Sequence, residues 1–400
     1  MDCVLNILGI IFLFVCAYVL SYHKQAISWK LIGRCLLLQF VWALFLVKVP
    51  IGSLAVSKLG DFITTIVGYS RSGLEFVFGS LVNPTGASGF IFVVQVLGTI
   101  IFVGSLVEVL NYLGVLGWII AKLGHLVGKI SGCSQLEGFI CTANIFLSDT
   151  EAPFMMSRYL KFMTKSEIMA MLVSGMSSMS VSIFGGYIAM GIPANYLIIA
   201  SALVPFSSII INAMLLPEEE KPQIVEKIDL SGESKASNII EAIANGSMKG
   251  IEMVIAIAAS IVAIISMVSL VNGGLAFINL KLEQIFAWLF SPFAYFMGLG
   301  NDLTLWAGEL LGSKMILTEF IPFAALGKVI DTLNTRTAMM LSVAISGFAN
   351  VSSMAICVSG IAALCPEMRG TLSKLVFKGM LGGFAASVLN ALILGIILWF

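Results

Sequence analysis

The sequence predicts an all-α polytopic membrane protein with eight transmembrane helices and two re-entrant helical hairpins that form an inverted repeat. Three observations lead to this fold class. The 400-residue chain has a mean hydropathy of +1.03 and only 11% charged residues, whereas soluble domains carry about 25% charge. Many uncharged stretches reach the roughly 20 residues that a membrane helix needs. Two further apolar regions contain acidic residues well inside them.

Stretches without charge locate the eight spans. The run from Ile168 to Pro217 has no charged residue and is long enough for two spans, which the segment "GIPANY" divides at Pro193. Each of the remaining stretches fits one span of about 17 to 25 residues once its flanks are included. These stretches are residues 3–21, 35–47, 89–107, 253–280, 337–366 and 379–400.

The distribution of basic residues predicts the orientation. No lysine or arginine precedes the first apolar run, whereas "HKQAISWK" follows it, and a cleaved signal peptide has the opposite order. The first helix is therefore expected to have its N-terminus outside. The inner segments then hold most of the 22 lysines and arginines, as the positive-inside rule requires. We expect a multi-pass protein of the cytoplasmic (inner) membrane, surrounded by lipid, with both termini outside.

The spans and the two acidic regions divide the chain into five parts. The hydrophilic segment 217–250 carries two prolines and a Ser/Gly-rich centre, which is typical of a linker, and we place it in the cytoplasm. The parts are N-terminal scaffold helices (1–130), a first hairpin with two spans (131–216), the cytoplasmic linker (217–250), a scaffold span (251–283), and a second hairpin with the last two spans (284–400).

The two predicted hairpins, Gln135 to Tyr159 and Gln284 to Gly327, resemble each other. "DTEAPF" at 149–154 and "LTEFIPF" at 317–323 both place Thr-Glu shortly before Pro-Phe. With the topology above, the first hairpin enters from inside and the second from outside. Inverted repeats of this kind place a substrate site near the midplane of many secondary transporters, and a helix break is tolerated there because its free backbone groups line a cavity.

A small-residue helix follows each hairpin. "SGMSSMSVS" at 174–182 aligns without gaps to "SGFANVSSM" at 346–354. The aligned pairs are Ser174 with Ser346, Gly175 with Gly347, and Ser178 with Asn350. These polar residues lie within membrane segments, so the alignment supports a repeat that includes the site.

Three carboxylates, Asp149, Glu151 and Glu319, are candidate site residues, because an ionisable group at the bilayer centre costs about 2.5 to 3.5 kcal/mol on insertion scales. Hydroxyl, amide and carbonyl oxygens near the predicted breaks suit a hard monovalent cation such as Na+, and Glu and Asn suit sugar hydroxyls and base edges. A polar, uncharged, ring-bearing solute with several hydroxyls fits this set. The neutral groups are Asn144, Ser148, Thr150, Ser178, Ser182, Asn350 and Ser353.

Composition argues against several other functions. The formal net charge is zero, which gives no reason to expect nucleic acid as a partner. The seven cysteines are scattered and only two histidines occur, so no metal-ligand spacing or nucleophile–base pair is visible. We expect neither an enzyme nor a bound cofactor.

Five segments carry a resemblance to a known family over almost the whole chain. They are "EFVFGSL" (75–81), "GFIF" (89–92), "TEAP" (150–153), "TEF" (318–320) and "GFANVSS" (347–353). Their order and spacing resemble the concentrative nucleoside transporters. The resemblance implies a cation-coupled importer of nucleosides that forms homotrimers, with eight membrane helices and two opposed re-entrant hairpins in each subunit.

The resemblance also implies a role for each matching position. The residues facing the nucleobase would be Ser148, Asp149, Thr150 and Glu151. The ribose hydroxyls would be bound by Glu319, Asn350 and Ser353. Apolar contact would come from Ile183 and Phe348. The Na+ ligands would be Asn144, the Leu147 carbonyl, Ser178 and the Met179 carbonyl.

One departure from the family bears on both substrate and ion. Ser148-Asp149 stands where relatives usually have Gly-Gln. An amide donates and accepts hydrogen bonds, but an ionised carboxylate only accepts. Two nearby carboxylates can also share a proton, so H+ coupling is an alternative to Na+. We expect Na+ first, because Asn144 and Ser178 are kept.

Two other transport functions stay open. A passive nucleoside facilitator or channel could use similar broken helices. A secondary transporter of another small polar solute, such as an amino acid or a dicarboxylate, would call for a basic residue in the site, and Lys314 is the one basic residue within either hairpin core.

Overall fold

The computed structural model describes residues 2–83, 85–86, 89–222 and 236–400. Over these residues the backbone forms helices and loops with no strand, which confirms the all-α prediction. The α-helices are α1 (Asp2–Leu20), α2 (Trp29–Val47), α3 (Pro50–Phe78), α4 (Gly98–Tyr112), α5 (Val115–Ser131), α6 (Gln135–Ala143), α7 (Glu151–Met155), α8 (Lys165–Ser177), α9 (Phe184–Ala189), α10 (Ala194–Leu215), α11 (Ile239–Leu275), α12 (Leu282–Phe296), α13 (Asn301–Ile316), α14 (Phe320–Gly327), α15 (Thr335–Ile345), α16 (Val351–Leu364) and α17 (Arg369–Ile397).

Short helical turns connect several of these helices. A π-helical turn leads directly into α4 at Val93–Leu97. The 3₁₀ turns are Lys24–Ala26, Gly79–Val82, Leu160–Phe162, Val181–Ile183, Ala276–Ile278, Ile330–Thr332 and Pro366–Met368.

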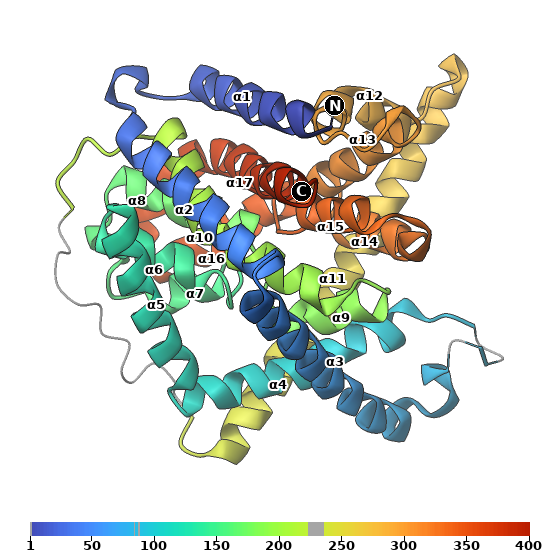
Figure 1. Ribbon diagram of the computed structural model, residues 1–400. Helices are drawn as coiled ribbons and strands as arrows, with labels where there is room; N and C mark the ends of the chain where they lie inside the picture. The colour runs from blue at the N-terminus through green and yellow to red at the C-terminus, as the bar shows by residue number, and fades with distance from the viewer. Residues whose placement is uncertain (1, 84, 87–88, 223–235) are drawn as a thin grey trace.

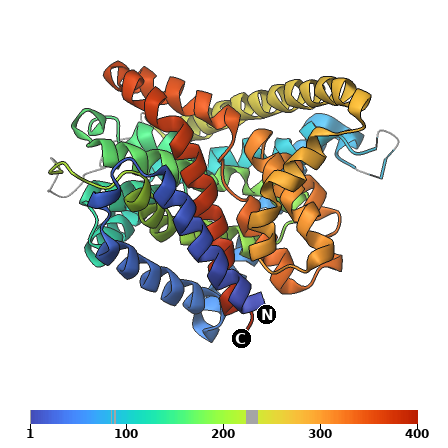
Figure 2. The same ribbon diagram turned by 90° about the horizontal axis from the view of Figure 1, so that it is seen from above.

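The helices form an inner group and an outer group. α17 runs through the middle of the molecule in both views (Figures 1 and 2), and it packs against α8, α10, α15 and α1. α8, α10 and α17 are buried on nearly every side, as expected for helices that are apolar all round. α1, α2, α3 and α11 instead leave most of their apolar side chains at least partly exposed. These four helices, the outer group, carry an exposed apolar surface.

Within the described residues, eight helices are long and apolar enough to cross a membrane, judged by length and composition. All but one coincide with a predicted span. The exception, Pro50–Val82, was not predicted because Lys58, Asp61 and Arg71 divide it into short uncharged stretches. These charges are on the exposed part of the helix, where Arg71 pairs with Glu75 at 2.6 Å.

The predicted span 337–366 is not one continuous helix. It forms α15 and α16, which are separated at residues 346–350 by Ser-Gly-Phe-Ala-Asn. The glycine has a φ of +88°, a value that side chains other than glycine rarely adopt.

The segment assigned to the linker is shorter than predicted on its C-terminal side. α11 begins at Ile239, inside the range 217–250, because Asn238 caps it: the Glu241 N–H donates to the Asn238 side chain at 2.9 Å. Apolar residues at 239, 240 and 243 then continue the helical pattern. Part of the linker, residues 223–235, lies outside the described residues.

Four helix pairs are interrupted in the interior. The gaps are residues 144–150 between α6 and α7, 178–183 between α8 and α9, 317–319 between α13 and α14, and 346–350 between α15 and α16. The first and third gaps fall in the two regions predicted as hairpins. The second region also contains a further helix, α12, which packs along α13. Each gap contains serine or threonine. Their hydroxyls favour helix interruptions, because they compete with the helix for backbone hydrogen bonds.

Helices α4 and α11 cross in close contact, which small residues permit. A Cβ added at Gly250 would lie 2.7 Å from the Ile101 Cα and 3.1 Å from the Ile100 carbonyl oxygen. Both obstacles are backbone atoms, which cannot rotate away. The contact therefore fixes how α11 lies across α4, next to the interrupted helices.

We predict that Gly250→Val destabilises the protein by about 1–3 kcal/mol, the usual cost of overpacking. The matched control is Gly273→Val on the same helix, where nothing lies within 4 Å of the added Cβ. The measurement is the melting temperature of the detergent-solubilised variants. Equal melting temperatures for the two variants would show that the α4–α11 contact is not tight.

Candidate functional site

Backbone hydrogen bonds join the interrupted segments to one another. The Val181 N–H donates to the Phe146 carbonyl at 3.1 Å, and the Phe348 N–H donates to the Ser178 carbonyl at 3.2 Å. A helix end leaves N–H and C=O groups without an intrahelical partner, and here part of that deficit is met across the breaks. The gap after α8 is therefore held between the gap after α6 and the gap after α15.

Side chains at the breaks accept hydrogen bonds from backbone N–H groups where the helices resume. The Glu151 N–H donates to the Ser148 hydroxyl at 3.3 Å, and the Ser148 N–H donates to the Glu151 carboxylate at 2.8 Å. This reciprocal pattern is that of a capping box. The Ser353 N–H likewise donates to the Asn350 side-chain oxygen at 2.8 Å, at the start of α16. Residues expected to contact a ligand thus also shape the backbone.

A cavity of about 370 Å³ lies among the breaks and α11. Its volume falls in the range of small-molecule sites, about 300–1,000 Å³. Nearly all of the residues predicted to contact substrate line it. They are Ser148, Asp149, Thr150, Ile183, Glu319, Phe348, Asn350 and Ser353.

The Glu319 carboxylate is 2% exposed and is surrounded by donors. The Tyr187 hydroxyl donates to Oε1 at 3.0 Å, and the Asn350 amide and the Thr318 hydroxyl donate to Oε2 at 3.2 Å each. A buried carboxylate needs such hydrogen bonds to offset its lost hydration. These contacts hold Glu319 at the cavity wall in one orientation.

Asp149 lies at the opposite break and is 8% exposed. The Cys357 thiol of α16 donates to its Oδ2 at 3.3 Å. A Cβ added at Gly175 of α8 would lie 3.1 Å from the Asp149 Cα, so the first break packs closely on α8. A thiol is a weak donor, and the carboxylate therefore keeps acceptor capacity for a ligand in the cavity.

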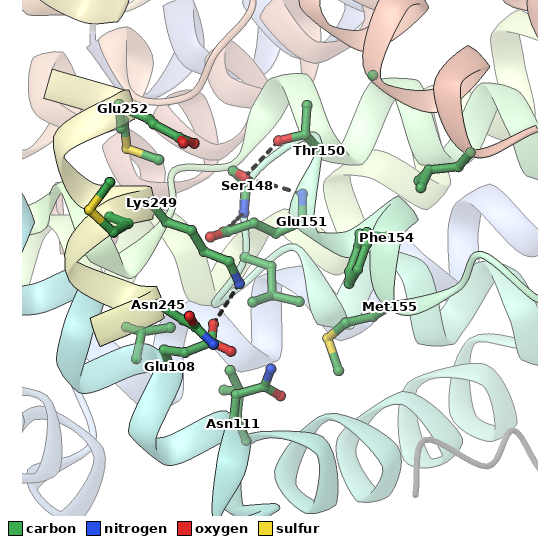
Figure 3. A pocket seen from close by; sticks show the side chains of 17 residues that line it. Glu108, Asn111, Ser148, Thr150, Glu151, Phe154, Met155, Asn245, Lys249 and Glu252 are labelled. Atoms are coloured by element: carbon green, nitrogen blue, oxygen red, sulfur yellow. Dashed lines mark hydrogen bonds and ion pairs between the residues drawn. The ribbon is translucent and has the colours of Figure 1, made fainter. Parts of the chain in front are cut away.

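Glu151 takes a different position from the other predicted residues. Its Oε2 accepts from the Ser148 N–H and from the Ser180 hydroxyl, the latter at 3.3 Å. It lines a neighbouring cavity of about 610 Å³ (Figure 3). Both cavities share Ser148 and Thr150 in their walls. Glu151 thus lies between the first break and the larger cavity.

The residues predicted to bind Na+ are buried together at the ends of α6 and α8. Asn144 is 0% exposed, and its Nδ2 donates to the Ser174 hydroxyl at 2.8 Å. Its Oδ1 is one of the buried side-chain atoms without a hydrogen-bond partner in the described chain. Leu147, Ser178 and Met179 are also buried. A buried amide oxygen without a hydrogen-bond partner, at the end of a helix, is a neutral oxygen that can serve as a ligand for a hard cation.

Several residues at the site were not predicted from the sequence. Lys249 and Glu252 of α11 line both cavities, and Lys249 donates to Glu108 of α4 at 2.7 Å, as Figure 3 shows. Lys249 and Glu252 are two charges three residues apart at the start of an apolar run. This pattern could have identified them as candidate site residues. Tyr187 and Cys357 had no such signal, because only the fold brings them to Glu319 and Asp149.

Comparisons with family models cover most of the chain. A model described as "Na+ dependent nucleoside transporter C-terminus" matches residues 196–395. The corresponding N-terminal model matches residues 8–81. A third model, described as "Nucleoside recognition", matches residues 93–194 and so includes the first two breaks.

Bacterial relatives match this chain over nearly the whole length of both proteins. An uncharacterized transporter of Haemophilus influenzae is 33% identical, over 98% of this chain and 97% of its own. The nucleoside permease NupC of Helicobacter pylori is 32% identical with the same coverage. The sodium/nucleoside cotransporter 1 of Mus musculus is 30% identical over 97% of this chain and 63% of its own.

Solved structures of CNTnw have the same fold. In an inward-facing substrate-bound state CNTnw matches with a TM-score of 0.93 and 31% identity, covering 99% of this chain and 98% of its own. A double variant of CNTnw in an outward-facing state also matches with a TM-score of 0.93, at 30% identity and the same coverage. Overall similarity therefore identifies the fold and not a conformational state.

We predict that Gly347→Ala destabilises the protein by about 1–3 kcal/mol. The glycine combines a φ of +88° with a close approach to the backbone of Ser177, and an alanine would be strained for both reasons. Gly370→Ala, on an exposed turn of α17 with open space around it, is the control and should raise stability slightly, as glycine replacement in a helix does. Melting temperatures that shift in the same direction would contradict the assignment of strain to Gly347.

Proposed function

The chain belongs to the Na+-dependent nucleoside transporter family, and from this premise we propose that it is a cation-coupled symporter that imports nucleosides across the cytoplasmic membrane. Members of this family are transporters, so the protein is not an enzyme. One observation supports the proposal most: a cavity bounded by carboxylate, amide and hydroxyl groups is lined by residues of the first break, and the same break begins with a buried amide oxygen, Asn144 Oδ1, that has no partner in the described chain.

The cavity suits a nucleoside at both of its polar ends. Glu319, Asn350 and Ser353 present a carboxylate, an amide and a hydroxyl, which pair with vicinal ribose hydroxyls. Ile183 and Phe348 offer apolar contact to the sugar and base. Ser148, Asp149 and Thr150 face the cavity from the first break and would bind the base edge, with Glu151 behind them.

Sodium is our first choice for the coupled cation. Asn144, Ser178 and the carbonyls of Leu147 and Met179 would surround it with neutral oxygens. The cation would neutralise the carbonyl ends of α6 and α8 that lie next to the first break. A nucleoside bound at that break would then depend on the cation, since both rest on the same backbone. A proton shared between Asp149 and a neighbouring carboxylate is the alternative.

The driving force of one cation is sufficient. A single charge moving down about 100 mV contributes roughly 2.3 kcal/mol, and a tenfold gradient adds about 1.4 kcal/mol. The sum of about 3.7 kcal/mol corresponds to a several-hundred-fold accumulation of solute.

We propose the following arrangement in the membrane. The α6–α7 and α13–α14 pairs are re-entrant hairpins that enter from opposite sides, and both termini lie outside. The interrupted helices with α10 and α17 form the moving unit, and the outer helices form a scaffold that contacts lipid and the other two subunits of a homotrimer. The contrast between the buried inner helices and the exposed apolar faces of α1 and α11 supports this division.

Uptake of labelled uridine and inosine into proteoliposomes tests the proposal. An imposed Na+ gradient, an imposed proton gradient and no gradient are compared. Concentrative uptake that requires one gradient establishes a symporter and identifies its ion. Saturable uptake that ignores both gradients would make the protein a passive facilitator, and absence of uptake of either nucleoside would point to another polar solute.

We predict that Glu319→Gln lowers nucleoside affinity by about 10- to 150-fold, because hydrogen bonds to a charged group contribute about 1.5–3 kcal/mol. Glu309→Gln is the matched control, since Glu309 is on the preceding helix α13 and lines neither cavity. The measurement is the concentration dependence of uridine uptake. Similar losses in both variants would argue against a ribose-binding role for Glu319.

We predict that Asp149→Gln changes the preference among nucleosides. A carboxylate only accepts hydrogen bonds, so the wild type should favour bases that present an N–H at this edge, whereas glutamine serves both kinds of edge. Competition of each natural nucleoside against labelled uridine measures the preference. If the wild type and the variant rank all nucleosides equally, Asp149 does not read the base.

A further inference from the structure

Tyr187 is a buried polar residue of the first half of the chain that contacts the second hairpin. It lies in α9, which begins directly after the break at residues 178–183, and its side chain is fully buried. A buried tyrosine hydroxyl usually has a hydrogen-bond partner, and this one donates to Oε1 of Glu319 at 3.0 Å. Tyr187 lines neither of the two cavities, whereas Glu319 lines the smaller one. The polar contact of Tyr187 with the cavity is therefore made through Glu319.

The second hairpin also restricts the orientation of the Tyr187 ring. The centroid of this ring lies 5.2 Å from that of Phe320 and 4.4 Å from that of Phe323, both in α14. The chain just after α9 meets the other end of α14, where a Cβ added at Gly191 would lie 3.4 Å from the Gly327 carbonyl oxygen. Contacts at both ends of α14 thus leave the hydroxyl little freedom to move away from Glu319.

Glu319 depends on neutral hydrogen-bond donors. The ion pairs found in the described residues do not include it. Lys314, the nearest basic residue in the sequence, instead donates to the Ala344 carbonyl at 3.0 Å and to the Ser346 carbonyl. A buried carboxylate without an ion pair relies on hydrogen bonds to replace its lost hydration, and Tyr187 supplies one of them.

The two oxygens of Glu319 receive their donors from different halves of the chain. Oε2 accepts from Thr318 and Asn350, which belong to the second half. Oε1 accepts from Tyr187, which belongs to the first half. A carboxylate has about four acceptor positions, and these donors already use most of them. They therefore determine the direction from which a ligand can still donate to Glu319.

We propose that Tyr187 is a positioning residue that determines how Glu319 recognises the sugar of a nucleoside. The terminal torsion of a glutamate side chain is broad, and the Tyr187 hydroxyl holds this carboxylate so that its open side meets a ribose hydroxyl. Without that hydrogen bond the ribose hydroxyl has to order the carboxylate on binding, which costs affinity. The inference deepens the proposed function and rests on it, because it names a sugar-specificity determinant for the same cavity.

Tyr187→Phe tests the proposal, because phenylalanine keeps the ring and removes only the hydroxyl. Inhibition constants of uridine, 2′-deoxyuridine and 3′-deoxyuridine are measured against uptake of labelled uridine into proteoliposomes. We expect uridine to bind the variant about 3- to 10-fold more weakly than wild type, the effect of one ordinary hydrogen bond. The deoxynucleoside that lacks the hydroxyl bound by Glu319 should change by less than about twofold. Glu319→Gln should have its smallest effect on that same deoxynucleoside.

Tyr196→Phe is the matched control, since Tyr196 lies in α10 and lines neither cavity. It should leave all three inhibition constants unchanged. The comparison is made between nucleosides within one variant, so it does not depend on the fraction of that variant that folds.

The role of Tyr187 is overturned if Tyr187→Phe weakens all three nucleosides equally, or if it leaves uridine affinity unchanged. Tyr187 would then only fill the space beside α14. A wild type that takes up no nucleoside is a different result, because it would refute the proposed function and this inference with it.

Discussion

The site depends on backbone groups that the interrupted helices leave free and that satisfy one another. The Phe348 N–H to Ser178 carbonyl bond and the Val181 N–H to Phe146 carbonyl bond connect three of the four breaks. In a bilayer each unsatisfied backbone group costs several kcal/mol, so interrupted helices persist only where such contacts or a ligand supply partners. The cavity, the orphaned Asn144 oxygen and the carbonyls around Lys314 all follow from this constraint.

In the proposed function, the remaining polar groups would be divided between solute and cation. Glu319 and Asn350 are held rigid by their own hydrogen bonds and still face the cavity. Asn144 sits behind the first break and shares its backbone with Ser148 and Asp149. A cation bound there, as proposed, would order this backbone and with it Ser148 and Asp149. In the proposed function, coupling between the two ligands would need no long pathway, because the residues proposed to contact each of them share one short segment, residues 144–150.

Sequence reasoning found the polar groups more reliably than the helix boundaries. Asp149, Glu319 and Asn350 were identifiable because polar groups are costly in a membrane, and the cavity contains all three. The lengths of uncharged stretches did not predict the helix at Pro50–Val82, because charged residues lie on its exposed part. They also predicted one span where the structure has two helices, α15 and α16. Tyr187, Cys357 and Lys249 reach the site only through tertiary packing, which a local pattern does not encode.

Binding linkage between cation and nucleoside tests the central claim most directly. The dissociation constant of uridine for the purified protein is measured by calorimetry over a range of Na+ concentrations at constant ionic strength. If the two ligands are coupled through residues 144–150, uridine affinity rises with Na+ with a limiting slope of one cation per nucleoside, and Na+ affinity rises equally with uridine. A uridine affinity that is the same at every Na+ and proton concentration would contradict coupled binding at this site.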